Sequence, residues 1–365
     1  MCGVNLAAKY DVAVVGSGIV GLGHALAAHQ RGLEVAVIDR ATAINGSTIR
    51  NFGHVGTSVH VGEAGDYAIK TRELYLRLAN EANFWLRQAG TVVVARHEDE
   101  MQVLREAGVG SLLNAEEVAE LVPVKGAVGG ALPAEDLQVD PRETAFAIQR
   151  WLEAQGVTFL WRTSAVGVEP GVLHTSRGSI DAETIIVAVN FDVDHLFPDI
   201  AEQFDIRRCG LDMMLTEGVG LERPLLTGSS MLRYSAFSTM PSAGAVRERY
   251  ARNIPGLLEF DVNQMYTERP DGTLLVGDTH YIGTTIAPFQ DERAFELLHE
   301  LGNNLFGTTL KVKQRWQGIY AKAAEDFIRT CPMDGVRIVT VGTGIGMTTG
   351  LGLAASVIDE LYGPA

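Results

Sequence analysis

The segment Tyr10–Arg40 constrains the fold more than any other part of the chain, because it has the pattern of a complete βαβ unit. Asp11–Val15 is a valine-rich apolar run, which is typical of a buried parallel strand. Ile19–Gln30 has helical composition and ends before an Arg-Gly pair, and Glu34–Ile38 is a second apolar strand. The segment therefore predicts that an α/β sheet begins at the N-terminal part of the chain.

Three glycines in this unit have G-x-G-x-x-G spacing, at Gly16, Gly18 and Gly21. The first glycine permits a tight turn, the second lets the backbone approach a pyrophosphate, and the third lets helix and strand pack closely. The helix N-terminus, with Ser17 in the turn, offers N–H groups to the phosphates. Asp39 is placed to bind the ribose hydroxyls of an adenosine, and an acid there argues against NADP. The pattern predicts a dinucleotide site; the alternative is a glycine-rich turn without a ligand.

Length and composition limit the remaining possibilities. With 365 residues, the chain is expected to form two connected domains. Its net charge of −15 argues against nucleic acid or an anionic membrane surface as a partner, because both select basic surfaces. The oligomeric state is left open.

Cysteine usage and hydropathy indicate the compartment. Cys2, Cys209 and Cys331 are few and scattered, so we expect neither a disulfide framework nor a metal site. Such usage fits a reducing compartment. Met1–Lys9 does not resemble a signal peptide, and no stretch approaches the ~18 apolar residues of a membrane span. The cytoplasm is the expected location.

The chain after Arg40 predicts further elements around the same ligand. Ala41–His60 is small, polar and glycine-rich, and it is interpreted as a loop near the cofactor or, alternatively, as a solvated loop. Helices are predicted over Ala64–Gly90, Glu98–Ala107, Ala115–Leu121, Asp140–Gln155 and Asp291–Leu305. Strands are predicted over Thr91–Arg96, Val157–Trp161, Ala165–Glu169, Val172–Ser176, Ile185–Val189, Arg207–Thr216, Met231–Thr239 and Gln264–Arg269.

The C-terminal end repeats the pattern of the N-terminal unit. The strand Arg337–Val341 leads into the glycine-rich run Gly342–Gly350 and then into the helix Leu351–Leu361. Two chain ends that return to one ligand, with a substrate domain between them, favour a large flavin dinucleotide over the NAD of a simple dehydrogenase.

Six segments occur along the chain in this order: DVAVVGSGIVG with VIDR, STIRNFGHVG, VDPRE, GSIDAETIIVAVN, RPDGTLLVGDT and TVGTGIGMTTGLGLA. Together they resemble the FAD-dependent D-amino-acid oxidase superfamily, which includes glycine oxidase, sarcosine oxidase and D-amino-acid dehydrogenase. The resemblance covers essentially the whole chain. It implies an α/β fold in which a Rossmann-like FAD-binding domain is interleaved with an antiparallel-sheet substrate domain. The expected domains are 9–90 with 140–200 and 331–365 for FAD, and 91–139 with 201–330 for the substrate.

The resemblance also implies the chemistry and the residues around the cofactor. A neutral amine gives a hydride to flavin N5, the imine hydrolyses, and O₂ is reduced to H₂O₂; no side-chain base is strictly required. The implied FAD-binding residues are Gly16, Ser17, Gly18, Gly21, Asp39, Arg40, Ser47, Thr48, Asn51, Phe52, Gly53, Val166, Asn190, Gly344, Ile345, Gly346, Met347 and Thr348. The FAD is expected to be non-covalent, although Arg329-Thr330-Cys331 echoes a covalent attachment segment of some sarcosine oxidases.

The chain departs from this family at the substrate. Glycine and D-amino-acid oxidases hold the substrate carboxylate with an arginine, and Tyr320 occupies the matching position here. The segments RNFGH, GDTHY and RWQGIY instead resemble a subgroup associated with aminophosphonate breakdown. A phosphonate dianion needs several donors. The candidates are Arg50, His54, Arg233, His280, Tyr320 and Lys322.

Each candidate has an alternative interpretation. Arg50 and His54 can serve the cofactor loop, His280 can lie behind the site or at the surface, and Arg233 and Lys322 can be solvated. Two other functions also stay open. One is a dehydrogenase that passes electrons to a quinone or a protein, and the other is a non-catalytic FAD-binding protein.

Overall fold

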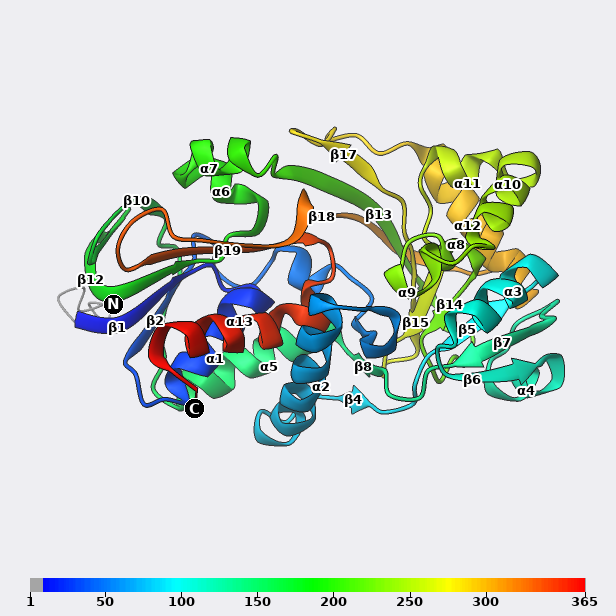
Figure 1. Cartoon of the computed structure of the whole chain (residues 1–365), viewed down its shortest axis with the longest axis horizontal. Helices are drawn as coiled ribbons and strands as arrows, with labels where there is room; N and C mark the ends of the chain where they lie inside the picture. The colour runs from blue at the N-terminus through cyan, green and yellow to red at the C-terminus, as the bar shows by residue number, and fades with distance from the viewer. Residues whose placement is uncertain (1–8, 365) are drawn as a thin grey trace.

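The computed structural model describes residues 9–364, so Cys2 and the predictions about the first eight residues lie outside the described residues. Figure 1 shows an elongated molecule with one large mixed sheet along its length. The parallel strands of β1, β2 and β12 lie at one end, and β5, β6 and β7 lie at the other. The α/β class that the sequence predicts is confirmed.

The order of strands in the large sheet explains how distant segments meet. Its main path, in spatial order, is β6 (Ser111–Asn114), β7 (Gly129–Leu132), β5 (Val92–Ala95), β14 (Leu225–Leu226), β15 (Met265–Glu268), β16 (Thr273–Gly277), β13 (Arg207–Glu217), β18 (Val312–Thr330), β19 (Val336–Thr343), β12 (Gly178–Val187), β1 (Lys9–Val15), β2 (Val35–Ile38) and β9 (Thr158–Leu160). Off this path lie β10 (Ala165–Glu169), β11 (Val172–Thr175) and β17 (Tyr281–Gly283). A small sheet contains β3 (His54–Val55), β8 (Leu137–Val139) and β4 (Leu86–Arg87).

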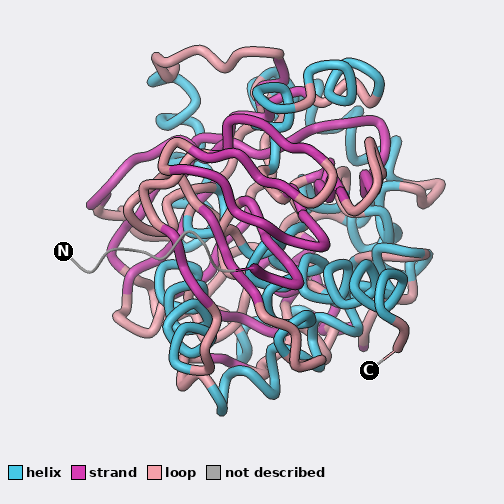
Figure 2. Tube along the Cα trace, turned by 90° about the vertical axis from the view of Figure 1, so that its left-hand side faces the viewer, coloured by secondary structure: helices cyan, strands magenta, loops and turns pink. Residues whose placement is uncertain are grey.

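Helices cover the sheet and fill the other end of the molecule. They are α1 (Ile19–His29), α2 (Glu63–Glu81), α3 (Glu98–Ala107), α4 (Ala115–Leu121), α5 (Pro141–Ala154), α6 (Val193–Leu196), α7 (Pro198–Gln203), α8 (Gly228–Met231), α9 (Ser235–Ser238), α10 (Ala243–Asn253), α11 (Pro255–Glu259), α12 (Glu292–Phe306) and α13 (Gly346–Tyr362). Short 3₁₀ turns form at η1 (Ser47–Ile49), η2 (Thr57–Val59) and η3 (Asn190–Asp192). Figure 2 shows the strands crossing the molecule with helices around them. No helix within residues 9–364 has the length and apolarity to cross a membrane.

The parallel part of the sheet positions the nucleotide-binding turn. β1 pairs in parallel with both β12 and β2, and β12 pairs in parallel with β19. Parallel strands end at one edge of a sheet, so Gly16 after β1 and Asp39 after β2 come together there. Helices α1 and α13 pack against each other over this part. The N- and C-terminal motifs therefore meet at one place.

Strand β18 connects the parallel and antiparallel parts. Its first half, Val312–Lys322, pairs with β13, and its second half, Phe327–Thr330, pairs with β19. Tyr320 lies in the first half, near the point where the strand changes partner. One strand thus carries side chains from the substrate part of the molecule to the cofactor part.

Three clusters of buried apolar side chains stabilise these parts. One lies around β5, β13, β15, β16 and α12, one between the parallel sheet and α1, α2, α5 and α13, and one on the opposite face of the parallel sheet. The predicted domain boundaries remain an interpretation of this arrangement.

Several sequence predictions about elements are wrong or incomplete. Met231–Thr239 is not a strand, because the chain forms the short helices α8 and α9 around it. The helix predicted over Ala64–Gly90 ends at Glu81, and Asn83 then adopts a left-handed backbone with φ of 51°. The strand predicted over Ile185–Val189 begins earlier, at Gly178. Strand β18 was not predicted at all.

The predicted cap of α5 is confirmed and joins the two parts of the chain. Asp140 accepts a hydrogen bond from the backbone N of Arg142 and holds Arg269, with Arg269 Nη2 at 3.0 Å from its Oδ2. Both ion-pair side chains are largely buried, at 15% and 5% exposure. We expect Asp140→Ala to lower the free energy of unfolding by about 2–3 kcal/mol, because it removes a cap and the buried carboxylate of Arg269, which keeps the half-exposed Asp271 and the hydroxyl of Thr273.

Denaturant unfolding of FAD-loaded protein measures this loss. Glu248→Ala is the matched control, because it removes a carboxylate whose ion pair with Arg252 is exposed. Its cost should stay under about 1 kcal/mol. Equal losses for the two variants would contradict the structural role given to Asp140.

Candidate cofactor and substrate site

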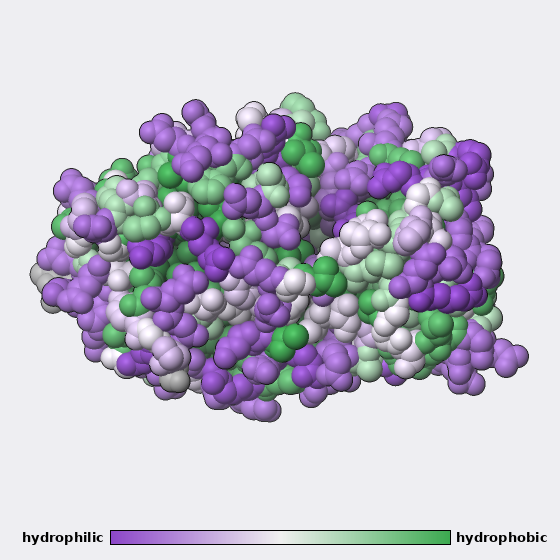
Figure 3. Space-filling view, viewed as in Figure 1, coloured by the Kyte–Doolittle hydropathy of each residue, from purple (hydrophilic) through white to green (hydrophobic). Residues whose placement is uncertain are grey.

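Two adjoining cavities open around the glycine-rich turns. The first has a volume of about 430 Å³ and the second about 510 Å³. Gly18, Ser47, Thr48 and Asn190 line both of them. Together the cavities form an elongated space that follows the edge of the parallel sheet. Figure 3 shows the molecule hollowed on one face between its two ends.

The second cavity has the features of an adenosine and pyrophosphate site. Gly16, Ser17, Asp39 and Arg40 line it. Asp39 Oδ2 accepts hydrogen bonds from the backbone N and the Oγ of Ser17, at 2.9 and 2.6 Å, and its Oδ1 accepts one from Ala41 N at 2.8 Å. The carboxylate therefore fixes the first turn to the end of β2.

Glycine is required at the first turn for steric reasons. Gly16 has φ of 105°, and a Cβ there would lie 2.5 Å from the carbonyl oxygen of Ala188. A Cβ at Gly21 would lie 1.9 Å from the carbonyl oxygen of Gly16. Gly18 is the N-cap of α1 and has no side chain to cap it, so the start of this helix faces the cavities. This cradle fits a pyrophosphate.

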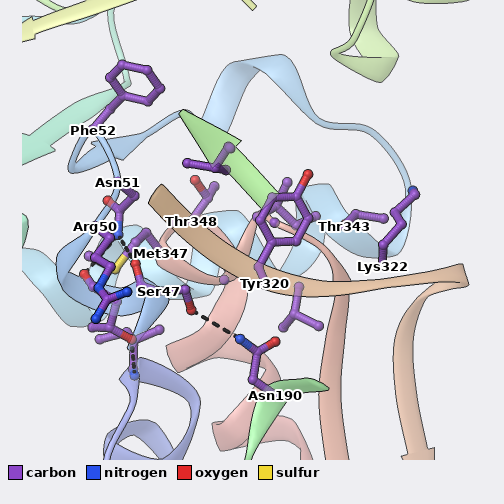
Figure 4. A pocket seen from close by; sticks show the side chains of 18 of the residues that line it. Ser47, Arg50, Asn51, Phe52, Asn190, Tyr320, Lys322, Thr343, Met347 and Thr348 are labelled. Carbon is purple, nitrogen blue, oxygen red and sulfur yellow. Dashed lines mark hydrogen bonds between the residues drawn. The ribbon is translucent and has the colours of Figure 1, made fainter. Parts of the chain in front are cut away.

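The turn η1 and the residues directly after it connect the two cavities. Thr48 Oγ1 accepts a hydrogen bond from Ile19 N at 2.9 Å, and Asn190 Nδ2 donates to Ser47 Oγ at 3.2 Å. Asn51 Nδ2 donates to the backbone oxygens of Ser47 and Thr48. Figure 4 shows Ser47 and Asn51 beside Arg50 and Met347, with Asn190 reaching Ser47 from the other side. The interpretation of Ala41–His60 as a merely solvated loop therefore does not hold.

The C-terminal glycine turn forms one wall of the first cavity. Gly344, Ile345, Gly346, Met347 and Thr348 line it. The N-terminus of α13 begins there without a side-chain cap. A Cβ at Gly344 would approach the ring of Tyr320 to 2.7 Å, so the turn packs directly against that ring. An aromatic ring system at this wall would meet backbone groups of the turn and the tyrosine.

All six candidate substrate residues line the first cavity, which brings together segments from four parts of the chain. They are Arg50, His54, Arg233, His280, Tyr320 and Lys322. Figure 4 shows Arg50 and Lys322 on opposite sides of Tyr320. Burial raises the pKa of Tyr320 well above its usual value, so the phenol stays protonated.

Hydrogen bonds distinguish the roles of these residues. His54 Nε2 lies 2.9 Å from Thr91 Oγ1 and 3.3 Å from Asp136 Oδ2, so this nitrogen is engaged behind the cavity. Arg233 forms an ion pair with Asp261 at 2.7 Å. Arg50 and Lys322 form no ion pair with any residue between positions 9 and 364. These two side chains keep their charges available for an anion.

Three predicted cofactor residues and Cys331 lie away from both cavities. Gly21 and Gly53 line neither of them; a Cβ at Gly53 would lie 2.0 Å from the carbonyl oxygen of Val139, so its place in the fold is a close packing contact. Val166 is 64% exposed, and its contact with an adenosine stays a prediction. Cys331 is also outside the cavities, and its Sγ accepts a hydrogen bond from Arg337 Nη1 at 2.7 Å. This geometry does not support covalent attachment there.

Several cavity residues were missed from the sequence. His60, Tyr234, Asn263 and Asp278 line the first cavity. Burial lowers the pKa of His60 to about 4, so this imidazole is neutral. Asp278 had a local signal, because it follows the apolar run of β16 and lies in the quoted segments RPDGTLLVGDT and GDTHY.

The sequence matches the FAD dependent oxidoreductase (DAO) family over residues 11–360. The chain belongs to this family. The cradle described above fits the FAD that gives this family its name. The expected FAD is thereby confirmed, and the alternative of an NAD-dependent dehydrogenase is wrong.

Individual relatives are more distant. Glycine oxidase from Geobacillus kaustophilus superposes with a TM-score of 0.78 at 18% identity, over 97% of this chain and 95% of that one. L-proline dehydrogenase from P. horikoshii gives a TM-score of 0.79 at 18% identity, over 97% and 93%. A D-amino acid dehydrogenase from Helicobacter pylori is 24% identical over 49% of this chain. The chain spans 60% of the length of that relative. These likenesses support the fold.

Proposed function

We propose that this oxidoreductase oxidises the C–N bond of a small amine that carries a phosphonate, such as 2-aminoethylphosphonate or its N-methyl derivative. The observation that carries the proposal is the polar lining of the first cavity. Arg50 and Lys322 lie on opposite sides of Tyr320, and Arg233 lines the same cavity. The sequence resemblance assigns Tyr320 to the position of the carboxylate-binding arginine of glycine and D-amino-acid oxidases. A phosphonate dianion can accept hydrogen bonds from several such donors at once.

The residues of the chain bind and orient the substrate. FAD supplies the hydride acceptor when it is bound. Lys322 and Arg50 hold the phosphonate, and the protonated hydroxyl of Tyr320 donates a hydrogen bond to it. The glycine turn at Gly344 packs against the ring of Tyr320 and covers the reacting carbon on that side. Holding the substrate in this way lowers the entropy cost of the reaction.

An amine panel tests the proposal. FAD-loaded protein is mixed anaerobically with glycine, sarcosine, D-alanine, 2-aminoethylphosphonate and N-methyl-2-aminoethylphosphonate, and loss of flavin absorbance is followed. We expect the two phosphonates to bleach the flavin fastest. If D-alanine or glycine were fastest, the phosphonate assignment would be wrong. A flavin that no amine bleaches would favour a non-catalytic FAD-binding protein.

The electron acceptor needs a second measurement. We propose O₂ as acceptor, with H₂O₂ as product, and a peroxide assay with the best amine tests this. The similarity to a D-amino acid dehydrogenase and to L-proline dehydrogenase supports the other outcome, a quinone or protein acceptor. Reduction of an artificial dye without oxygen uptake would establish that alternative.

Lys322→Met should raise KM for the phosphonate substrate by about 10- to 100-fold, because one charge-assisted hydrogen bond is worth roughly 1.5–3 kcal/mol. The apparent affinity for an uncharged amine should change little. Lys311→Met is the matched control, because Lys311 lies at the surface and pairs with Glu217. Steady-state kinetics with both amines measures the effect. An equal rise in KM for the two amines would show that Lys322 does not bind the anion.

A further inference from the structure

The first cavity has a group of hydrogen-bond acceptors that the cationic residues do not explain. Asp278 lies directly after β16 and is only 5% exposed. Its backbone is fixed by two hydrogen bonds with Asn263, Asp278 N to Asn263 O at 2.7 Å and Asn263 N to Asp278 O at 2.8 Å. Its Oδ1 is buried and has no hydrogen-bond partner among the described residues. A buried acceptor without a donor costs free energy, which a ligand that donates a hydrogen bond to it would recover.

His280 places a second acceptor beside this carboxyl group. Its Nδ1 lies 2.8 Å from the backbone oxygen of Asp261, and a carbonyl only accepts, so Nδ1 carries the proton. Burial, together with the Arg233 guanidinium, lowers the pKa of His280 to about 3. The ring is therefore neutral, and its Nε2 presents a lone pair 3.8 Å from Asp278 Oδ2. Two acceptors at this separation can share one amino group through bonds of about 2.8 Å.

The electrostatics around Asp278 suit the exchange of a proton. Burial raises the pKa of its carboxyl group to about 7, against the opposing effect of the Arg233 guanidinium. A carboxylate with such a pKa matches the range expected of a general base. The titratable and charged groups that face it are Arg233, Tyr234, Asp261, His280, Tyr320 and Cys209.

We propose that Asp278 and Nε2 of His280 receive the amino group of the substrate, and that Asp278 takes the ammonium proton. This inference rests on the proposed function. In the step, R–NH₃⁺ and the carboxylate become R–NH₂ and the carboxylic acid, one N–H bond breaks, one O–H bond forms, and no electron is transferred. The amine is left with the free electron pair that oxidation of its C–N bond requires. His280 thus serves the amine and not the phosphonate.

The acceptors and the cationic donors of the cavity come from different segments of the chain. Asp278 and His280 come from the end of β16, whereas Lys322 and Tyr320 come from β18 and Arg50 from the cofactor loop. The cavity therefore has an acceptor group for an amine and separate donors for an anion. This division selects a zwitterionic ligand over a simple alkylamine or a simple phosphonate.

Rapid mixing of the FAD-loaded Asp278→Asn variant with 2-aminoethylphosphonate tests the inference. At pH 7 we expect flavin reduction to slow by at least about 100-fold. The residual rate should rise about tenfold per pH unit below the pKa of the free amine, because the amine must then arrive neutral, whereas the wild-type rate should level off near pH 7. Ethylphosphonate, which lacks the amino group, should bind both proteins with Kd values within twofold, measured by its perturbation of the flavin spectrum.

Two further variants complete the experiment. His280→Asn retains an N–H group near the Nδ1 position but lacks the Nε2 acceptor, and we expect about a tenfold loss in reduction rate with little change for ethylphosphonate. Asp199→Asn is the matched control, because Asp199 is an exposed acid that lines neither cavity. It should reduce its flavin like the wild type.

The outcomes separate this inference from the proposed function. If Asp278→Asn keeps the wild-type rate and pH profile, the role of Asp278 is overturned while the amine oxidation stands. If ethylphosphonate binding weakens as much as amine reduction, Asp278 only supports the shape of the cavity, and the inference is again overturned. If no amine reduces the wild-type flavin, the proposed function fails, and this inference fails with it.

Discussion

Gly21→Ala is expected to yield a protein that is purified without FAD. The added Cβ would lie 1.9 Å from the carbonyl oxygen of Gly16 and 3.0 Å from its carbonyl carbon, so the obstacle is rigid backbone and not a movable side chain. Relief of the clash must displace either the first turn or the start of α1. Both carry the pyrophosphate cradle, and overpacking of this kind costs roughly 3 kcal/mol. The loss of FAD affinity should exceed about 100-fold.

Absorbance at the flavin bands and titration with added FAD measure this effect. Gly244→Ala in α10 is the matched control, because no atom lies within 4 Å of the position where its Cβ would be placed. That variant should retain its yellow colour and gain slightly in stability, since alanine favours a helix over glycine. A Gly21→Ala protein that binds FAD like the wild type would show that the turn is not the cradle.

The success of the sequence predictions depended on whether the signal was local. Helices α3 and α4 have the predicted bounds. At the start of α4, the side chain of Asn114 accepts a hydrogen bond from Glu117 N, and the side chain of Glu117 accepts one from Asn114 N. Such caps and periodic apolar residues lie within a few positions of the element that they specify. The end of α2 was missed because the apolar stripe continues past Glu81, while the chain turns at Asn83 and pairs in β4.

Strand β18 shows why other elements could not be predicted. Many of its residues are charged or polar, and its first half gains its backbone partners from β13, about 100 positions earlier in the sequence. Met231–Thr239 shows the opposite error. Its alternating apolar residues suggest a strand, but Thr227 and Ser230 form a capping box that begins α8. Non-local pairing determines strand β18, and a local cap determines helix α8; the apolar pattern predicts neither element.

The residues of the candidate site also divide into those that a local motif predicts and those that only the fold brings together. The glycine motifs, Asp39 and the loop residues Ser47 and Thr48 were predicted because each lies in a contiguous motif with a physical requirement. Asp278 lies in the segment RPDGTLLVGDT, which carries the family resemblance, but nothing in that segment marks it as a cavity residue. Asp278 and His60 meet only when the segments after β16 and η2 pack around one cavity. Their chemical interest comes from burial, which no local sequence pattern reports.

Acid is expected to destabilise the protein strongly between pH 6.5 and 4, because buried imidazoles must gain a proton on unfolding. Burial lowers the pKa of His24 and of His60 to about 4, against 6.5 for a solvated imidazole. In this window the unfolded chain binds protons that the native state does not, so the free energy of unfolding falls as the pH falls. Each residue accounts for up to about 3 kcal/mol. Asp278, with its raised pKa, acts in the opposite direction and offsets part of this loss.

His24→Leu isolates one of these contributions. His24 is fully buried in α1; its Nδ1 donates to the backbone oxygen of Val20 at 2.7 Å, and its Nε2 has no hydrogen-bond partner among residues 9–364. Leucine fills a similar volume and takes no proton, so the variant should lose about 1.4 kcal/mol per pH unit less than the wild type between pH 6 and 4.5. Guanidinium unfolding at saturating FAD measures both curves. At pH 8 neither residue carries charge, and the difference there reports packing alone. Curves that stay parallel from pH 8 to 4.5 would mean that His24 is protonated in the native state, in conflict with its burial.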